Sequence, residues 1–328
     1  MKNKNIVETC THCHACQNQC AFLKKYGIDI GDIKRLNELA YHCFLCGKCT
    51  EVCPEKIDGR AYILNLRRKK VEEADGNFTE KGYGMLLKEK KDYIYRNYRH
   101  AQGRSVLFPG CNFPSFYPKT TKKLVNVLKS YGIGVAYDCC GKPVAELGLE
   151  EDEKRIINRI DRELKTRKIK EVIMLCPNCY AYLKPRLTEV KITSIYEKLE
   201  ELGIGKKNLT PAKVFLPCPD REKKELLSQI EAYASGGLTP VGNVQCCGLG
   251  GCAPVKEPEL AKNMGEALNA GLKDRESEKI YSYCASCAGN LNRNGCKNVT
   301  HVLTEIMGTH EKADTGKSML NRIKTKFI

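Results

Sequence analysis

Two copies of one five-cysteine pattern occupy the second part of the chain. In each copy a lone cysteine precedes an adjacent cysteine pair, and a Cys-x-x-Cys motif follows. The copies consist of Cys111, Cys139, Cys140, Cys176 and Cys179, and of Cys218, Cys246, Cys247, Cys284 and Cys287. The lone cysteine and the pair are separated by 27 residues in both. Because a repeat of fixed period sets the architecture of a chain, this one predicts two equivalent units with five thiols at matched positions.

Two further cysteine runs lie within the first 60 residues. Each reads Cys-x2-Cys-x2-Cys-x3-Cys, and they comprise Cys10, Cys13, Cys16 and Cys20, then Cys43, Cys46, Cys49 and Cys53. This is the spacing of two-cluster bacterial ferredoxins, in which the fourth cysteine of each run ligates the other cluster. It predicts two cubane [4Fe–4S] clusters, one on Cys10, Cys13, Cys16 and Cys53 and the other on Cys43, Cys46, Cys49 and Cys20. A zinc site would need four ligands rather than two interleaved runs.

Other side chains near these motifs could also bind metal. His12, His14 and His42 are expected beside the clusters or at the surface, since cysteines fill all eight ligand positions. Cys252 and Cys296 belong to no run, and we expect both to be buried structural thiols.

Composition indicates the class of protein. Of the 328 residues, 20 are cysteine. The first residues resemble no export signal, and no apolar tract is long enough to span a membrane. Clustered Cys-x-x-Cys motifs in a cytoplasmic chain bind metal more often than they form disulfides. We therefore expect a cytoplasmic metalloprotein.

The net charge of +16 is typical of a nucleic-acid binder, but it counts every thiol as neutral. Thiolates on iron–sulfur clusters would offset much of it. Residues 58–104 mix many Lys and Arg residues with Tyr83, Tyr93, Tyr95 and Tyr98, a combination that can bind single-stranded nucleic acid. We prefer a solvated connector helix whose tyrosines pack on the next domain, so no nucleic acid partner is expected. One alternative is that this segment docks an acidic redox partner. The other is that the protein is a zinc-rich nucleic-acid binder.

Strand and helix signals alternate in both repeats. Residues 105–108, 135–137 and 171–175 resemble strands that end just before cysteines, as do residues 213–216, 241–245 and 279–283. Such alternation predicts a parallel sheet, and open α/β sheets place ligands at the carboxyl ends of their strands. A helix with Thr120 or Thr121 as its N-cap should end near Gly132.

These signals predict an α plus α/β architecture. Its parts are a helical two-cluster ferredoxin domain (1–80), a basic connector (81–104), CCG-type repeats (105–205 and 206–310) and a tail (311–328). A helix is expected within residues 32–41, where apolar residues recur at helical spacing. A pseudo-twofold relation between the repeats would bring their ten cysteines to one shared cleft.

The five-cysteine repeat resembles the CCG-type cysteine-rich domain of the heterodisulfide reductases. The domain order resembles their fused, single-chain form, in which that domain is joined to the ferredoxin component, and one subunit of anaerobic glycerol-3-phosphate dehydrogenase is a relative. The resemblance covers Cys10 to Cys287. It rests on the motifs Pro109-Gly110-Cys111, Cys139-Cys140-Gly141-Lys142-Pro143 and Cys246-Cys247-Gly248-Leu249-Gly250-Gly251. It implies that the five cysteines of each repeat hold a noncubane [4Fe–4S] cluster at the cleft, where the chemistry takes place.

The resemblance implies an iron–sulfur oxidoreductase that passes electrons from two cubanes to two noncubane clusters, which reduce a disulfide. The implied partners are a flavoprotein or other redox subunit and a small disulfide or thiol, with membrane association only through a partner. The chain has no GxGxxG fingerprint for a flavin or nicotinamide of its own.

One family motif departs from the pattern. The second repeat commonly reads Pro-Cys-His, whereas this chain has Pro219 in place of the histidine, followed by Asp220 and Arg221. We expect Asp220 at the surface, and Arg221 matches a common basic position. The lost histidine favours the alternative of an electron-transfer subunit that links a flavoprotein dehydrogenase to a quinone or membrane cytochrome. The ten intact cysteines favour disulfide chemistry.

Overall fold

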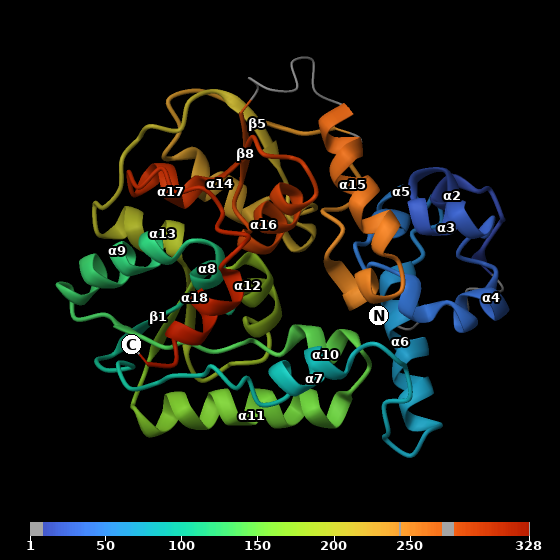
Figure 1. Ribbon diagram of the computed structural model, residues 1–328, viewed down its shortest axis with the longest axis horizontal. Coiled ribbons are helices and arrows are strands. Elements are labelled where there is room, and N and C mark those ends of the chain that lie inside the picture. Colours follow the sequence, from blue (N-terminus) through green and yellow to red (C-terminus); the bar gives the residue numbers. More distant parts are fainter. Residues whose placement is uncertain (1–8, 243, 271–278, 328) are drawn as a thin grey trace.

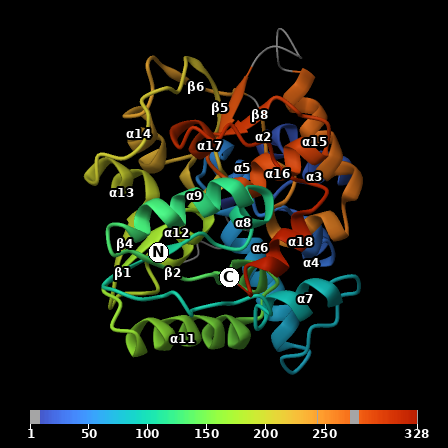
Figure 2. The same ribbon diagram turned by 60° about the vertical axis from the view of Figure 1, so that its left-hand side comes forward.

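The computed structural model of the chain describes residues 9–242, 244–270 and 279–327. A helical N-terminal region packs beside two α/β repeats of one design (Figures 1 and 2). The helices of the N-terminal region are α2 (Ala15–Gln19), α3 (Ala21–Tyr26), α4 (Ile33–Glu38), η1 (Ala40–His42), α5 (Lys48–Val52) and α6 (Gly59–Glu72). The helix expected within residues 32–41 is thus present as α4 followed by one 3-10 turn. Its Leu36 is buried in a small apolar core with Phe22 and Leu23.

Each repeat contains a four-stranded, fully parallel sheet, which confirms the predicted fold class. The sheets have the orders β2-β1-β3-β4 and β6-β5-β7-β8. The strands are β1 (Ser105–Phe108), β2 (Gly134–Val135), β3 (Glu171–Met174), β4 (Lys191–Ser194), β5 (Ala212–Phe215), β6 (Leu238–Pro240), β7 (Ile280–Ser282) and β8 (Val299–His301). The central strands β1 and β3 are apolar runs buried almost throughout, as is typical of parallel sheets covered on both faces.

Helices cover both faces of the sheets. In the first repeat they are α8 (Phe113–Phe116), α9 (Pro118–Lys129), α10 (Lys142–Glu146), α11 (Glu150–Thr166), α12 (Pro177–Leu183) and α13 (Ile195–Glu201). In the second they are η2 (Cys218–Asp220), α14 (Glu225–Glu231), η3 (Gly250–Val255), α15 (Pro258–Ala270), α16 (Ala285–Arg293) and α17 (Val302–Ile306). Figures 1 and 2 place α9 and α11 on opposite sides of β1.

Three predictions about element ends were wrong. Helix α9 begins at Pro118, two or three residues before the expected threonine N-cap, because proline is favourable in the first helical turn. Strand β2 ends at Val135, and Tyr137 instead forms an isolated antiparallel bridge to Asn97. Strand β6 ends at Pro240, so residues 241–245 do not form the predicted strand (residue 243 lies outside the described residues).

The connector and the tail both pack on the repeats. The connector contains α7 (Gly84–Lys90), and all four of its tyrosines are buried, as expected. The tail forms α18 (Ser318–Lys324), whose Asn321 donates to the backbone oxygen of Ser115 at 3.2 Å. Within the described residues, no helix is long and apolar enough to cross a membrane.

The basic segment, residues 58–104, was expected to be solvated, and this prediction was wrong for some of its cations. The side chain of Arg67, on α6, is fully buried. Its guanidinium donates to the backbone oxygens of Ala40 (3.0 Å) and Cys43 (2.7 Å) in the N-terminal region. It also donates to the backbone oxygens of Glu146 in the first repeat (2.6 Å) and of Gly251 in the second repeat (2.7 Å). One side chain therefore joins all three parts of the chain, because a buried cation needs its hydrogen-bond capacity filled.

Replacing Arg67 with Met should remove one hydrogen bond from each of four backbone carbonyl groups. Since each unsatisfied buried group costs about 1–3 kcal/mol, we expect a loss of stability of roughly 3 kcal/mol or more. The measurement is the urea midpoint of the anaerobically purified protein. Lys69→Met is the matched control on the same helix, because the Lys69 side chain is 70% exposed and should change stability by less than about 0.5 kcal/mol. Equal midpoints for the two variants would contradict the role given to Arg67.

Candidate iron–sulfur sites

The N-terminal region contains two hollows lined by cysteines. The first is lined by Cys10, Cys13, Cys16 and Cys53. The second is lined by Cys20, Cys43 and Cys49, and the charge of Cys46 acts on Cys20 and Cys49. Cys53 thus lies with the first run and Cys20 with the second, and the assignment of these two sets as cluster ligands stays a prediction.

Burial shapes the chemistry of these thiols. It raises the pKa of Cys43 to about 11 and also raises the pKa of Cys20 and Cys49. Because the thiolate is the form that binds metal, a cation must displace these protons, and metal binding is coupled to proton release. The sulfur-rich, water-poor lining suits a soft metal cluster.

The three histidines near these hollows contact carboxylates. His12 and His14 are more than half exposed and lie 2.9 and 3.3 Å from the buried carboxylate of Asp29. His42 lies 2.7 Å from Glu257, which belongs to the second repeat. All three therefore lie beside the cysteine sets or at the surface, as predicted.

In the first repeat the five thiols form a connected group at the carboxyl ends of the strands. Cys111 follows β1, the pair Cys139 and Cys140 follows β2, and Cys176 follows β3. Cys139 is hydrogen-bonded to Cys111 and Cys140, and Cys179 to Cys140 and Cys176. The two strands β1 and β3 neighbour each other where the strand order reverses, which is the usual ligand position of an open α/β sheet.

The second repeat reproduces this arrangement. Cys246 is hydrogen-bonded to Cys218 and Cys247, and Cys287 to Cys247 and Cys284. The repeat spacing in the sequence thus corresponds to a repeated cluster of thiols. Each group offers five sulfur ligands that are largely withdrawn from water, and this donor set fits an iron–sulfur cluster.

The two groups meet between the repeats. The thiols of Cys176 and Cys284 are hydrogen-bonded to each other. The side-chain amide of Asn178, in the first repeat, donates to the sulfur of Cys284 at 3.6 Å. Asn112 donates to the hydroxyl of Ser286 at 2.7 Å. The predicted convergence of both groups on one site is therefore present.

The second repeat also touches the N-terminal cysteines. A hydrogen bond with Cys246 lowers the pKa of Cys46 to about 6. The side-chain amide of Gln245 donates to the sulfurs of Cys20 (3.4 Å) and Cys46 (3.7 Å). Its oxygen accepts from the backbone nitrogen of Ala21 at 2.7 Å. Sequence patterns gave no signal for Gln245, because its partners lie more than 190 residues away.

Glycines make this approach possible. A Cβ atom at Gly250 would lie 2.4 Å from the carbonyl oxygen of Phe44, and one at Gly251 would lie 2.5 Å from that of Cys43. The Gly-Gly pair after the second cysteine pair therefore lets the loop pack directly on the backbone of a predicted ligand loop.

Asp220 corrects an expectation. It is 4% exposed rather than at the surface. Its carboxylate accepts from the backbone nitrogens of Leu226 and Leu227 (both 3.1 Å) and from the Tyr283 hydroxyl (2.8 Å). Asp220 is thus a structural anchor for α14. Arg221 lies at the cysteines, donating to Cys218 sulfur at 3.7 Å and to the backbone oxygen of Gln245 at 2.7 Å.

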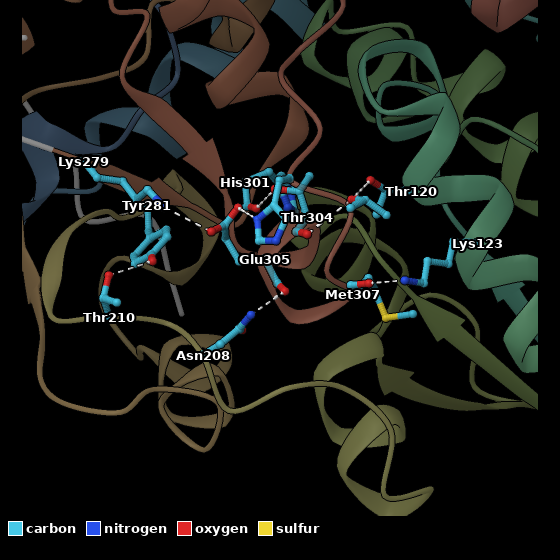
Figure 3. A network of polar contacts seen from close by, with 12 residues as sticks. Thr120, Lys123, Asn208, Thr210, Lys279, Tyr281, His301, Thr304, Glu305 and Met307 are labelled. Atoms are coloured by element: carbon cyan, nitrogen blue, oxygen red, sulfur yellow. Dashed lines mark hydrogen bonds and ion pairs between the residues drawn. The ribbon is translucent and has the colours of Figure 1, made fainter. Parts of the chain in front are cut away.

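A buried histidine was missed by sequence reasoning. His301 ends β8, and its Nδ1 accepts from the backbone nitrogen of Leu303 at 3.2 Å, capping α17. Burial lowers its pKa to about 3, although the charge of Cys284 acts in the opposite direction. It is therefore neutral. Figure 3 shows it in the network that ties α17 to the first repeat, where Lys123 of α9 donates to the Met307 oxygen at 2.6 Å.

The two remaining cysteines are buried, as expected. Cys252 donates to the backbone oxygen of Pro143 at 3.7 Å, and Cys296 is fully buried. The hydrogen bond of Cys252 thus goes to a backbone oxygen and not to a thiol of either five-cysteine group.

Comparison with protein families agrees with this division of the chain. A cysteine-rich domain family, CCG, matches residues 105–184 and again residues 213–292. A 4Fe-4S dicluster domain family matches residues 6–57.

Curated proteins are similar to this chain at low sequence identity. One subunit of the fumarate reductase (CoM/CoB) of Methanothermobacter marburgensis is 23% identical over 85% of this chain and 66% of its own length. One subunit of the dihydromethanophenazine:CoB–CoM heterodisulfide reductase of Methanosarcina acetivorans is 23% identical over 79% of this chain and 74% of its own. EtfAB:quinone oxidoreductase of Syntrophomonas wolfei is 24% identical over 45% of this chain and 25% of its own.

The chain spans less than two thirds of the length of the first of these relatives. The activities of the relatives are therefore not assigned to this chain by similarity. The matched domains, the two parallel-sheet repeats and the gathered thiols nevertheless agree with one another. The chain therefore contains a 4Fe-4S dicluster domain followed by two cysteine-rich CCG domains, and it is similar to subunits of a heterodisulfide reductase and of a fumarate reductase (CoM/CoB).

Proposed function

We propose that the chain is the iron–sulfur subunit of an oxidoreductase that reduces a disulfide. Electrons enter at the N-terminal region and pass to the repeats. The proposed cubane ligands are Cys10, Cys13, Cys16 and Cys53, and Cys43, Cys46, Cys49 and Cys20. The proposed noncubane ligands are the five cysteines of each repeat. When bound, such clusters supply one-electron carriers and, in the repeats, iron sites for sulfur.

The main support for the proposal is that cysteines of the N-terminal region contact those of the second repeat, which in turn contact those of the first repeat. Cys46 contacts Cys246, so the N-terminal region adjoins the second repeat. Cys284 contacts Cys176, so the second repeat adjoins the first. This order supports entry at the N-terminal region and chemistry at the junction of the repeats.

The junction suits a substrate with two sulfurs. Reduction of a disulfide consumes two electrons and two protons and breaks one S–S bond, giving two thiols. Two complete five-cysteine groups face each other at Cys176 and Cys284, so each could receive one substrate sulfur. A reduced flavoprotein partner would supply the electrons, since the chain has no flavin fingerprint of its own.

The alternative is an electron-transfer subunit that delivers electrons to a quinone or a membrane cytochrome. Pro219 in place of the family histidine favours it, because Asp220 is committed to α14 and does not replace a proton donor. The similarity to a quinone oxidoreductase favours it as well.

Disulfide turnover by the purified chain distinguishes a disulfide reductase from an electron-transfer subunit. Oxidation of reduced methyl viologen should accelerate when a disulfide is added, with the CoM–CoB heterodisulfide, cystine and glutathione disulfide as the panel. Cys140→Ser and Cys247→Ser should reduce the rate to background, while Cys296→Ala, outside both groups, should retain it. Viologen oxidation by a quinone analogue but by no disulfide would select the alternative.

Gln245→Leu should uncouple the N-terminal region from the repeats. The change removes two N–H donors from the sulfurs of Cys20 and Cys46, and such donors raise the reduction potential of a cluster. We expect one midpoint potential to fall in an EPR-monitored titration, and electron transfer from the N-terminal region to the repeats to slow.

Thr239→Leu is the control on the neighbouring exposed strand position, and it should change neither quantity. Unchanged potentials in Gln245→Leu would contradict the role given to the Gln245 amide.

A further inference from the structure

Two segments that neither family model covers meet over the cysteines of the first repeat. They are residues 84–95, with α7, and residues 318–324, which form α18, and we call them together the cap. Arg322 on α18 and Glu89 on α7 form an ion pair that joins the two segments. Tyr93 and Tyr95 form a buried cluster with Cys139, and Cys111 and Ile323 pack against it.

The cap carries two cations that share one carboxylate. Lys90 is 8% exposed, and its Nζ lies 2.7 Å from the carboxylate of Glu89. Arg322 donates to the same carboxylate at 2.6 Å and to the side-chain oxygen of Asn112 at 2.9 Å. The charges of Glu89, Lys90 and Arg322 sum to one positive charge. Because these side chains are largely buried, that charge requires a partner.

The first-repeat cysteines are the groups that this charge faces. Arg322 donates to Asn112, the residue after Cys111, and the next residue of α18, Ile323, packs with Cys111 on the same buried cluster. The Nζ of Lys90 lies 5.1 Å from the centre of the Tyr93 ring, which packs with Cys139. Both cations therefore lie beside the ligands proposed for the first repeat. The nearby Asp138 and Arg159 form an ion pair at 2.9 Å and add no net charge.

The second repeat has no such excess among its described neighbours. Arg221 lies beside Cys218, but Glu51 is 3.7 Å from it. Lys142, whose charge is also felt by Cys218, forms an ion pair with Glu146. His301, near Cys284, is neutral. The buried carboxylate of Asp220, two residues from Cys218, adds a negative charge, so the local charges at this group show no positive excess, unlike those at the first repeat.

We propose that the cap makes the first repeat the electron sink of the protein, by raising the reduction potential of the group bound there above that of the second repeat. A reduced cluster carries one more negative charge, so a buried cation favours reduction, and weak solvent screening strengthens the effect. In the step concerned, the second-repeat group loses one electron and the first-repeat group gains it. The inference rests on the proposed function, because it requires clusters in both repeats.

The cap also links the two groups mechanically. Arg322 holds Asn112, and Asn112 donates to Ser286 between the two cysteines of the second Cys-x-x-Cys motif. Arg322 is thus a positioning residue as well as a charge, and a test must separate the two roles.

The experiment is an EPR-monitored redox titration of the anaerobic holoprotein with dithionite and mediators. Arg322→Gln and Lys90→Gln should each lower one and the same midpoint potential. Arg322→Lys, which keeps the charge, should restore most of it. Lys324→Gln is the matched control on α18, because Lys324 is exposed and should leave every potential unchanged. Cys247→Ser should alter a different signal, which assigns the signal of the second repeat, because the thiols beside Cys247 are those of Cys246 and Cys287.

The outcomes separate this inference from the proposed function. Unchanged potentials in Arg322→Gln and Lys90→Gln, with wild-type iron content, would overturn the electron-sink proposal alone. An equal shift in Arg322→Lys and Arg322→Gln would also overturn it, because position and not charge would then matter. A wild-type protein without EPR signals from the repeats would instead refute the proposed function on which the inference rests.

Discussion

The guanidinium of Arg67 binds four backbone carbonyl oxygens that come from all three parts of the chain. Within the described residues it makes no ion pair, and these hydrogen bonds use four of its five N–H groups. Two of the carbonyls belong to Cys43 and Gly251, which lie in a predicted cubane ligand loop and in the loop after the second cysteine pair. Because Gly250 and Gly251 let these loops touch backbone to backbone, the separation of the two sulfur groups is set by the fold itself. The contact of Cys46 with Cys246 depends on this junction.

Charged side chains are distributed unevenly around the sulfur groups. Arg67 acts on Cys43, Arg221 lies between Cys218 and the N-terminal cysteines, and Lys90 and Arg322 face Cys111. Iron–sulfur potentials respond to net charge, burial and hydrogen bonds to sulfur. A chain with two equivalent cysteine repeats can therefore have inequivalent electron acceptors. The connector and tail provide this difference, although they contribute no cysteine.

Cysteine spacing predicted much of the site, because ligand geometry fixes it locally. The structure places Cys53 with the first run and Cys20 with the second, while their roles as cluster ligands stay a prediction. The parallel sheets were predictable as well, since apolar runs end just before cysteines. The short strands β4 and β8 were not predicted, because no ligand follows them and their burial depends on β3 and β7.

Burial of single charges could not be predicted from sequence. Arg67 and Lys90 stand in a basic, tyrosine-containing stretch whose composition is typical of a solvated face. Their burial depends on distant partners, such as Gly251, which lies 184 residues from Arg67. Asp220 was expected at the surface for the same reason, since its partner Tyr283 lies 63 residues further on. Long-range hydrogen bonds leave no periodic trace in one sequence.

The central claim is that the four cysteine groups each hold an iron–sulfur cluster. The most direct measurement is iron and acid-labile sulfide per chain in anaerobically purified protein. Four [4Fe–4S] clusters predict about sixteen of each. About eight of each, matching two loaded cubanes only, would contradict the account, because the repeats would then hold no cluster.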